Sequence, residues 1–214
     1  MKKIIIFDFD NTLFSTSQFK KELIENFKKL GITQEIFEKT YFASKKNKKY
    51  QGYNYHIKLI KKIYPKYSFK QLKDVFKRTL RKSYFFVYPE VLKILPNLSL
   101  KYELVLISFG EKNFQRKKIK NSGLEKFFKK IIISSKFNKI SSFSKIFCKK
   151  AQMFFIEDNP LVLKTVKKKF PEVITICLTG KKRLKKHPSI DYYLKNFSQL
   201  LKILKKIEKG QKTH

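Results

Sequence analysis

The sequence predicts an α/β protein, in which a parallel sheet is flanked by helices and an all-helical cap follows the first strand. Three observations predict it. An apolar run, Ile4 to Phe7, ends directly in two carboxylates, Asp8 and Asp10. From residue 86 onward, strand-like apolar runs alternate with helical patterns, which is typical of a parallel sheet with right-handed crossovers. Between residues 15 and 84 the pattern is helical, with no strand-like run.

The first strand predicts a ligand site. An unbroken apolar run is typical of a central parallel strand that is buried on both faces. Side chains alternate along a strand, so Asp8 and Asp10 are expected on the same side, with Phe9 turned away. Two carboxylates held close together repel each other unless a proton or a cation lies between them. Ligands of open α/β sheets bind at the carboxyl ends of strands, so a cation site is expected there.

Residues 15–85 are expected to form the helical cap domain. Gly31 is a suitable stop for its first helix, and Thr33 can cap the second. Ser68 and Gln71 form a capping box for the fourth. The four helices are expected over residues 18–30, 34–44, 55–64 and 69–82.

Residues 1–14 and 86–214 are expected to form the core domain. Pro89 opens a helix that is expected to run through Leu95. Further strands are expected at residues 104–107, 131–133, 153–156, 173–178 and, as a short edge strand, 191–194. Helices are expected from about 111 to near 123 and over residues 141–150, 160–170 and 197–208.

The net charge of +35 has two interpretations. One is a polyanionic partner such as nucleic acid. The other is biased coding, because arginine occurs only at positions 78, 81, 116 and 183. A surface selected to recognise phosphates or bases would use arginine as well as lysine. We favour biased coding, so a small phosphorylated substrate is the expected partner, and nucleic acid is the less favoured one.

The remaining composition indicates a cytoplasmic protein. Cys148 and Cys177 are the only cysteines, so neither a disulfide framework nor a zinc-type spacing is present. Both are expected to pack in the core. No apolar run approaches the ~18 residues that a membrane span needs, so no membrane association is expected. The pattern does not predict the oligomeric state.

Polar groups end three of the predicted strands. These are Asp8 with Asp10, then Ser108, and then Glu157 with Asp158. The arrangement resembles the haloacid dehalogenase superfamily of phosphohydrolases, which have a Rossmann-like core. The first group resembles the Asp-x-Asp-x-Thr motif of that family, Ser108 its second motif, and the last group its acidic fourth motif. The helical insertion lies where many members carry a cap.

The resemblance implies a Mg²⁺-dependent phosphatase. Asp8 would attack phosphorus and form an aspartyl-phosphate. Asp10 would protonate the leaving alkoxide and then deprotonate the hydrolytic water. Asp8, Asp158 and the backbone carbonyl of Asp10 would hold Mg²⁺, with Glu157 and Asn159 as further candidates beside the metal. In this family an acid two residues after the nucleophile separates phosphatases from dehalogenases, and Asp10 stands at that position.

Phosphate binding is assigned less directly. The resemblance implies that Ser108, with Phe109 after it, contacts a phosphoryl oxygen. The third motif of the family is a lysine at or near the start of the helix that precedes the fourth strand. In this sequence that strand is expected over 153–156, and Lys136, Lys139 and Lys145 all lie nearby. We favour Lys139, which stands just before the helix expected over 141–150.

Other interpretations remain open at this stage. Asp-x-Asp can simply start a turn, and Asp158 or Asn159 can cap the helix that begins at Pro160. A phosphomutase would share the site, and a non-enzymatic polyanion- or RNA-binding protein could be built on an inherited fold. Residues of the cap that could touch the leaving group are Tyr41, Lys45, Tyr53 and His56.

Overall fold

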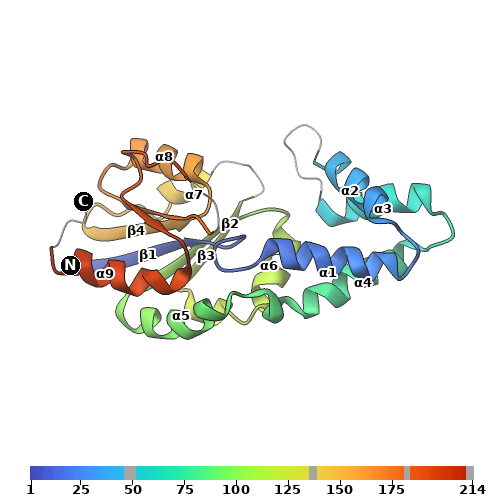
Figure 1. Ribbon diagram of the computed structural model, residues 1–214, viewed down its shortest axis with the longest axis horizontal. Coiled ribbons are helices and arrows are strands. Elements are labelled where there is room, and N and C mark those ends of the chain that lie inside the picture. The colour runs from blue at the N-terminus through green and yellow to red at the C-terminus, as the bar shows by residue number, and fades with distance from the viewer. Residues whose placement is uncertain (46–51, 135–138, 181–183, 211–214) are drawn as a thin grey trace.

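A six-stranded sheet, parallel throughout, forms the centre of the core in the computed structural model, which describes residues 1–45, 52–134, 139–180 and 184–210 (Figure 1). The strand order is β3-β2-β1-β4-β5-β6, so β1 is central, and β6 is an edge strand as expected. The parallel register confirms the α/β prediction. The strands are β1 (Lys2–Asp8), β2 (Glu103–Phe109), β3 (Lys130–Ser134), β4 (Ala151–Glu157), β5 (Ile174–Leu178) and β6 (Tyr192–Leu194).

Four helices lie between β1 and the next core helix and extend to one side of the sheet (Figure 1). They are α1 (Thr16–Lys28), α2 (Gln34–Ala43), α3 (Gly52–Ile63) and α4 (Phe69–Arg81), followed by a short 3-10 helix, η2 (Ser83–Phe86). We call α1 to α4 the helical region. Their starts follow the predicted capping: Thr33 accepts from the Ile36 amide, and Ser68 forms the capping box with Gln71.

The other helices cover both faces of the sheet. They are α5 (Pro89–Lys101), α6 (Lys112–Asn121), η3 (Glu125–Phe127), α7 (Lys139–Ser144), α8 (Pro160–Lys169), η4 (Phe197–Gln199) and α9 (Leu200–Glu208). Ile5 and Phe7 of β1 join the buried cluster that contains α5 and α9, whereas Ile4 and Ile6 join the cluster that contains α7 and α8. Because alternate side chains of β1 face opposite sides of the sheet and helices cover both sides, every residue of the run has to be apolar.

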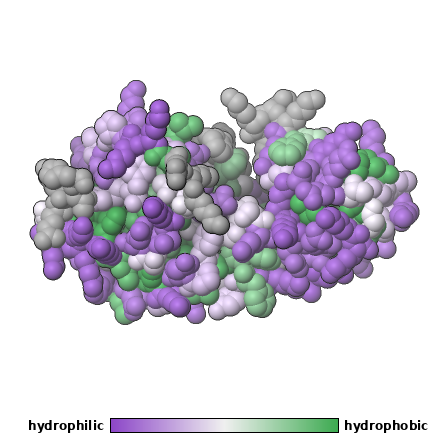
Figure 2. Space-filling view, viewed as in Figure 1, coloured by the Kyte–Doolittle hydropathy of each residue, from purple (hydrophilic) through white to green (hydrophobic). Residues whose placement is uncertain are grey.

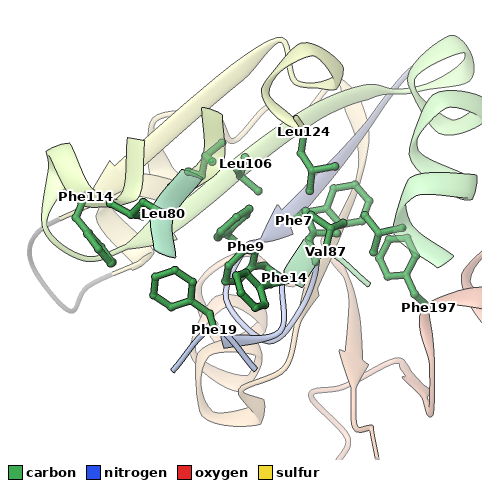
Figure 3. Close-up of a cluster of buried hydrophobic side chains, with 14 of the residues drawn as sticks. Phe7, Phe9, Phe14, Phe19, Leu80, Val87, Leu106, Phe114, Leu124 and Phe197 are labelled. Atoms are coloured by element: carbon green, nitrogen blue, oxygen red, sulfur yellow. The ribbon is translucent and has the colours of Figure 1, made fainter. Parts of the chain in front are cut away.

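One hydrophobic cluster continues from the sheet into the helical region (Figure 3). Phe9 stacks on Phe14 with a centroid separation of 5.0 Å, and Phe14 lies 5.7 Å from Phe19 of α1. Phe19 in turn meets Phe114 of α6 edge-on at 6.1 Å. Such aromatic contacts contribute about 0.5–1.5 kcal/mol each beyond their buried area, so they help to hold α1 against the core.

The two connections to the helical region run side by side. An antiparallel bridge joins Phe14 to Val87, and the Ser15 amide donates to the Phe86 carbonyl over 2.7 Å. The Tyr88 amide donates to the Leu13 carbonyl over 3.1 Å. The outgoing and returning chains therefore form a short two-stranded ribbon at the edge of the core.

Two element boundaries differ most from the sequence-based expectation. The helix that starts at Pro89 does not end at Leu95 but continues through Pro96 to Lys101. The apolar face that includes Leu98 packs on the sheet beyond the proline, and this burial outweighs the lost hydrogen bond. The helix expected over 141–150 is instead α7, which already begins at Lys139 and ends at Ser144, where tight turns replace it.

The outer surface of the view in Figure 2 is mostly hydrophilic, especially over the helical region. This agrees with a sequence that contains 51 lysine and arginine residues. Within the described parts of the chain, no helix combines the length and the apolar character that a membrane crossing requires.

Candidate active site

The site begins where β1, β2 and β4 end beside one another. Asp8 pairs with Ile107 of β2, so Ser108 follows at the same rim. Phe7 pairs with Ile156 of β4, which places Glu157 level with Asp8. The parallel register thus brings together groups that are about 100 and 150 residues apart along the chain. This is the convergence that the sequence predicted.

Three carboxylates form a cluster at this rim. Asp8, Glu157 and Asp158 each offer an oxygen, and these oxygens lie within 4.8 Å of one another. Asp8 and Glu157 are buried, with 3% and 1% of their surface exposed. Buried carboxylates at this spacing repel unless a cation or proton lies among them, and an all-oxygen donor set fits Mg²⁺. Glu157, expected only beside the metal, therefore belongs to the same cluster as Asp8 and Asp158.

The cluster is supported by local hydrogen bonds. The Thr12 hydroxyl donates to Asp8 Oδ2 over 3.3 Å, and the Asn159 amide donates to Glu157 Oε1 over 3.2 Å. The Asn159 side chain accepts from the Leu161 amide and caps α8, so the N-cap interpretation is correct for Asn159. Asn159 thereby orients the loop after β4.

Asp10 has a different environment from Asp8. Its carboxylate accepts from Lys118 Nζ at 2.5 Å, from the Thr16 hydroxyl at 2.5 Å and from Gln115 Nε2 at 2.6 Å. Burial alone would raise the pKa of Asp10, but the Lys118 charge and these three hydrogen bonds outweigh it and lower that pKa. The side chain of Asp10 is therefore held as a carboxylate, whereas the family resemblance assigns only its backbone carbonyl to the metal.

Ser108 is fully buried at the end of β2. Its Oγ accepts from Gln115 Nε2 at 2.9 Å, and Gln115 also donates to the Phe109 carbonyl over 2.8 Å. Gly110, at φ +150°, follows at once; a Cβ there would lie 2.7 Å from Gln115 Cγ. The glycine therefore allows Gln115 to reach both Ser108 and Asp10. Among the described residues, the Ser108 hydroxyl accepts one bond and donates none, so its proton is available to an incoming oxygen.

Of the three candidate lysines of the third motif, the structure describes the side chain of Lys145. Lys136 lies outside the described residues, and the side chain of Lys139 is also outside them, although α7 begins at this residue. Lys145 is exposed and does not line the cavity between the rim of the sheet and the helical region. The assignment of Lys139 to the phosphate stays a prediction.

A cavity of about 670 Å³ extends from this rim to the helical region. Its core end is lined by Asp8, Asp10, Glu157, Asp158 and Phe109. Of the four cap residues expected near a substrate, the three that line it are Tyr41, Lys45 and His56. Tyr53 does not line it but is buried against Phe76 and Phe114, at centroid separations of 5.6 and 5.3 Å.

Sequence reasoning missed Lys118 and Gln115. Both lie on α6 and are buried, with 4% and 3% of their surface exposed. A signal was present, because positions 115, 118, 119 and 122 share one face of that helix. Polar side chains on a face that also carries Ile119 indicate a buried polar contact. The partner, Asp10, is 108 residues away from Lys118 and could not be read from the helix itself.

The comparisons with known proteins agree with this geometry. Residues 5–176 match the family model of the haloacid dehalogenase-like hydrolases. The chain belongs to this family. No match to a curated protein was found by sequence. The matched range includes both acidic segments, the β2 rim and the helical region, so the family assignment covers the whole candidate site.

Solved structures of haloacid dehalogenase-like proteins share the fold. A protein from Burkholderia xenovorans described as a haloacid dehalogenase-like hydrolase has a TM-score of 0.75 and 18% identity, over 94% of this chain and 96% of that one. The HAD-hydrolase YfnB of Bacillus subtilis, in a magnesium-bound form, has a TM-score of 0.68 and 18% identity, over 95% of this chain and 99% of that one. L-2-haloacid dehalogenase from Xanthobacter autotrophicus has a TM-score of 0.66 and 12% identity, over 96% of this chain and 99% of that one. At these identities the likeness shows the fold alone.

Proposed function

We propose that this haloacid dehalogenase-like hydrolase is a Mg²⁺-dependent phosphatase that acts on small phosphomonoesters through an aspartyl-phosphate on Asp8. The observation that carries the proposal is the joint placement of the three-carboxylate cluster and Asp10 in one cavity. A halide leaves as a stable anion and needs no proton, whereas an alkoxide does. A carboxyl group beside a cation site therefore suits ester hydrolysis better than dehalogenation.

The first half-reaction would use the rim as follows. An oxygen of Asp8 attacks phosphorus in line, and the ester oxygen departs as the aspartyl-phosphate forms. Mg²⁺, held by Asp8, Asp158, Glu157 and the backbone of Asp10, would let an anionic nucleophile approach an anionic phosphate. Ser108 would donate its hydroxyl proton to a phosphoryl oxygen, and Lys139 would offset negative charge there.

Asp10 would act in both halves. It has to bring a proton to the departing oxygen, although Lys118 lowers its pKa in this structure. To carry this proton, Asp10 must therefore loosen its contact with Lys118 when an ester is bound. In the second half-reaction the carboxylate form, which Lys118 and Gln115 stabilise, accepts a proton from the water that attacks the aspartyl-phosphate.

The helical region would serve as the cap domain, with residues 15–85 as cap and residues 1–14 and 86–214 as core. A cap over the acidic rim excludes bulk water during the first transfer. It also limits the size of the leaving group to what the cavity of about 670 Å³ can hold. This favours small phosphate esters, such as sugar phosphates or nucleotides, over phosphorylated macromolecules.

The proposal is tested with a panel of small phosphate esters and with 2-chloropropionate. Wild type with Mg²⁺ should release phosphate from at least one ester, EDTA should stop the release, and added Mg²⁺ should restore it. Asp8→Asn should abolish it while the melting temperature stays close to that of wild type. Asp74→Asn, at a half-exposed carboxylate of α4, is the matched control and should keep full turnover.

Two results would contradict the proposal. Undiminished phosphate release by Asp8→Asn would exclude Asp8 as the nucleophile. Chloride release from 2-chloropropionate without phosphate release from any ester would make the protein a dehalogenase.

A further inference from the structure

The cavity is electrically divided between its two ends. The acidic residues that line it all come from elements of the core, where Lys118 also lines it; Glu111, at the start of α6, lies against Gly52 of α3. On the side of the helical region, the charged lining residues within the described part of the chain are Lys20 and Lys45. A ligand that bridges the two ends therefore meets a cation site at one end and ammonium groups at the other.

The wall between the two ends is aromatic and apolar. The helical region contributes Phe19, Leu23, Phe37 and Phe76 to it. His56 also lines this wall. Burial lowers the pKa of its imidazole to about 4, and the charge of Lys20 acts in the same direction, whereas the hydrogen bond to the Phe37 carbonyl opposes the shift. The imidazole is thus neutral near pH 7. A leaving group that crosses this wall would gain by being apolar, because few hydroxyl groups could be paired there.

The two ammonium groups converge on one ring. Lys45 Nζ lies 4.1 Å from the centroid of Tyr41, and Lys20 Nζ lies 5.2 Å from the same centroid. In a lysine-rich chain a single lysine beside a cavity means little. Two that share a ring lining the cavity, one from α1 and one just after α2, make a localised positive site.

The charge of this site selects a monoanion. Glu38 pairs with Lys20 at 3.1 Å and offsets one of the two positive charges. Glu38 itself does not line the cavity. Among the described residues, the net charge that this pair of lysines and Glu38 offers to a ligand is therefore close to one positive unit, which matches a carboxylate better than a dianionic phosphate.

We infer that the substrate is a phosphomonoester whose leaving group has an apolar, ring-sized body and a carboxylate at the end away from the phosphate. This deepens the proposed function and rests on it. The phosphoryl group lies at the acidic rim, the body packs against the aromatic wall, and the carboxylate meets Lys45 and Lys20 beside Tyr41.

A matched pair of esters tests the inference. One is 3-(4-phosphonooxyphenyl)propanoate and the other is its carboxamide. Two methylene groups insulate the ring from the difference, so the phenol leaves about equally well from both. Wild type should favour the carboxylate in kcat/KM by roughly three- to tenfold, the range expected for partly exposed ion pairs.

Substitutions of the lysines should remove this preference selectively. Lys45→Met, Lys20→Met and the double variant should bring the ratio toward one, chiefly by lowering kcat/KM for the carboxylate. Lys66→Met is the matched control, because Lys66 Nζ also lies over a ring, that of Tyr67 at 5.2 Å, but does not line the cavity. A wild-type ratio of one, or a ratio that the double variant leaves unchanged, would overturn the inference.

Binding separates this inference from the proposed function. If neither ester is hydrolysed, the affinity of Asp8→Asn for each is measured by calorimetry with Mg²⁺ present. Tighter binding of the carboxylate, lost in Asp8→Asn/Lys20→Met/Lys45→Met, would support the cap site while phosphatase activity fails. Equal binding of the two esters would overturn the cap site as well.

Discussion

The rim of the sheet and the helical region build their parts of the cavity in different ways. At the rim, Asp8, Ser108 and Glu157 are placed by strand ends and by the parallel register. In the helical region, lining rings such as Phe37 and Phe76 are placed by packing between helices, and Phe27 lies between them at 5.4 and 5.3 Å. Backbone geometry therefore sets the reacting groups, whereas side-chain packing sets the surroundings of the leaving group.

This difference predicts that rim substitutions change the chemistry, whereas substitutions in the helical region change the choice among esters. After the loss of turnover expected for Asp8→Asn, the largest effect is expected for Asp10→Asn. With an alkyl phosphate, kcat should fall by about 10²–10⁴, because the alkoxide loses its proton donor. With p-nitrophenyl phosphate, whose leaving group needs no proton, the fall in the first half-reaction should be much smaller.

Burst kinetics on both esters measures that contrast. Phe37→Leu, in the helical region, is the comparison variant and should change KM without this dependence on the leaving group. An equal loss on both esters in the first half-reaction would mean that Asp10 does not protonate the leaving group.

The next effect concerns the buried ion pair at the rim. Lys118→Met should destabilise the protein by about 3 kcal/mol, because it leaves the Asp10 carboxylate without its charged partner. The side chain of Lys118 is 4% exposed and that of Asp10 is 26% exposed, which places the effect toward the lower end for buried pairs. Denaturant unfolding measures it, and the double variant Lys118→Met/Asp10→Asn should recover part of the loss. If the double variant recovers none of the lost unfolding free energy, the loss comes from packing of Lys118 against the surrounding rings.

A pH-dependent effect of similar size is expected in the helical region. The pKa of His56 is about 4 in the folded protein, against an ordinary value of 6.5. The unfolded chain therefore binds the proton first as pH falls. The stabilisation from the neutral imidazole is complete above pH 6.5 and is lost toward pH 4, by about 3 kcal/mol.

Unfolding free energies of wild type and His56→Gln between pH 4 and pH 7 check this expectation. His56→Gln should flatten the slope, whereas His187→Gln should leave it in place. A slope that persists in His56→Gln would show that other groups cause the acid sensitivity.

The smallest effect is expected for a surface pair of the helical region. Lys82 Nζ lies 2.8 Å from Glu22 Oε1, with side chains 55% and 32% exposed. Lys82→Met should change the unfolding free energy by less than about 1 kcal/mol, and less in high salt. An effect as large as that of Lys118→Met would remove the distinction between the rim pair and the surface pair.

The same contrast explains how much could be predicted from the sequence. Asp8 and Asp158 end apolar strands, and the ends of parallel strands share an edge, so their convergence followed from local pattern. The contact between Lys118 and Asp10 did not, because it depends on how α6 is rotated against the sheet. Tyr53 was misjudged for a similar reason, since packing against Phe114 turns it from the cavity. Local pattern thus predicts strand ends well and helix rotation poorly.

The paired ribbon at Phe14 and Val87 has a consequence for exchange of parts between proteins. The chain leaves the core and re-enters it at nearly the same place, so the 70-odd residues between can be replaced without reordering the strands, provided that the new segment covers the rings of Phe14 and Phe114. A foreign insert whose two ends lie equally close could be grafted there. Different side chains would then face the acidic rim, whereas the strand register that forms the rim would stay unchanged.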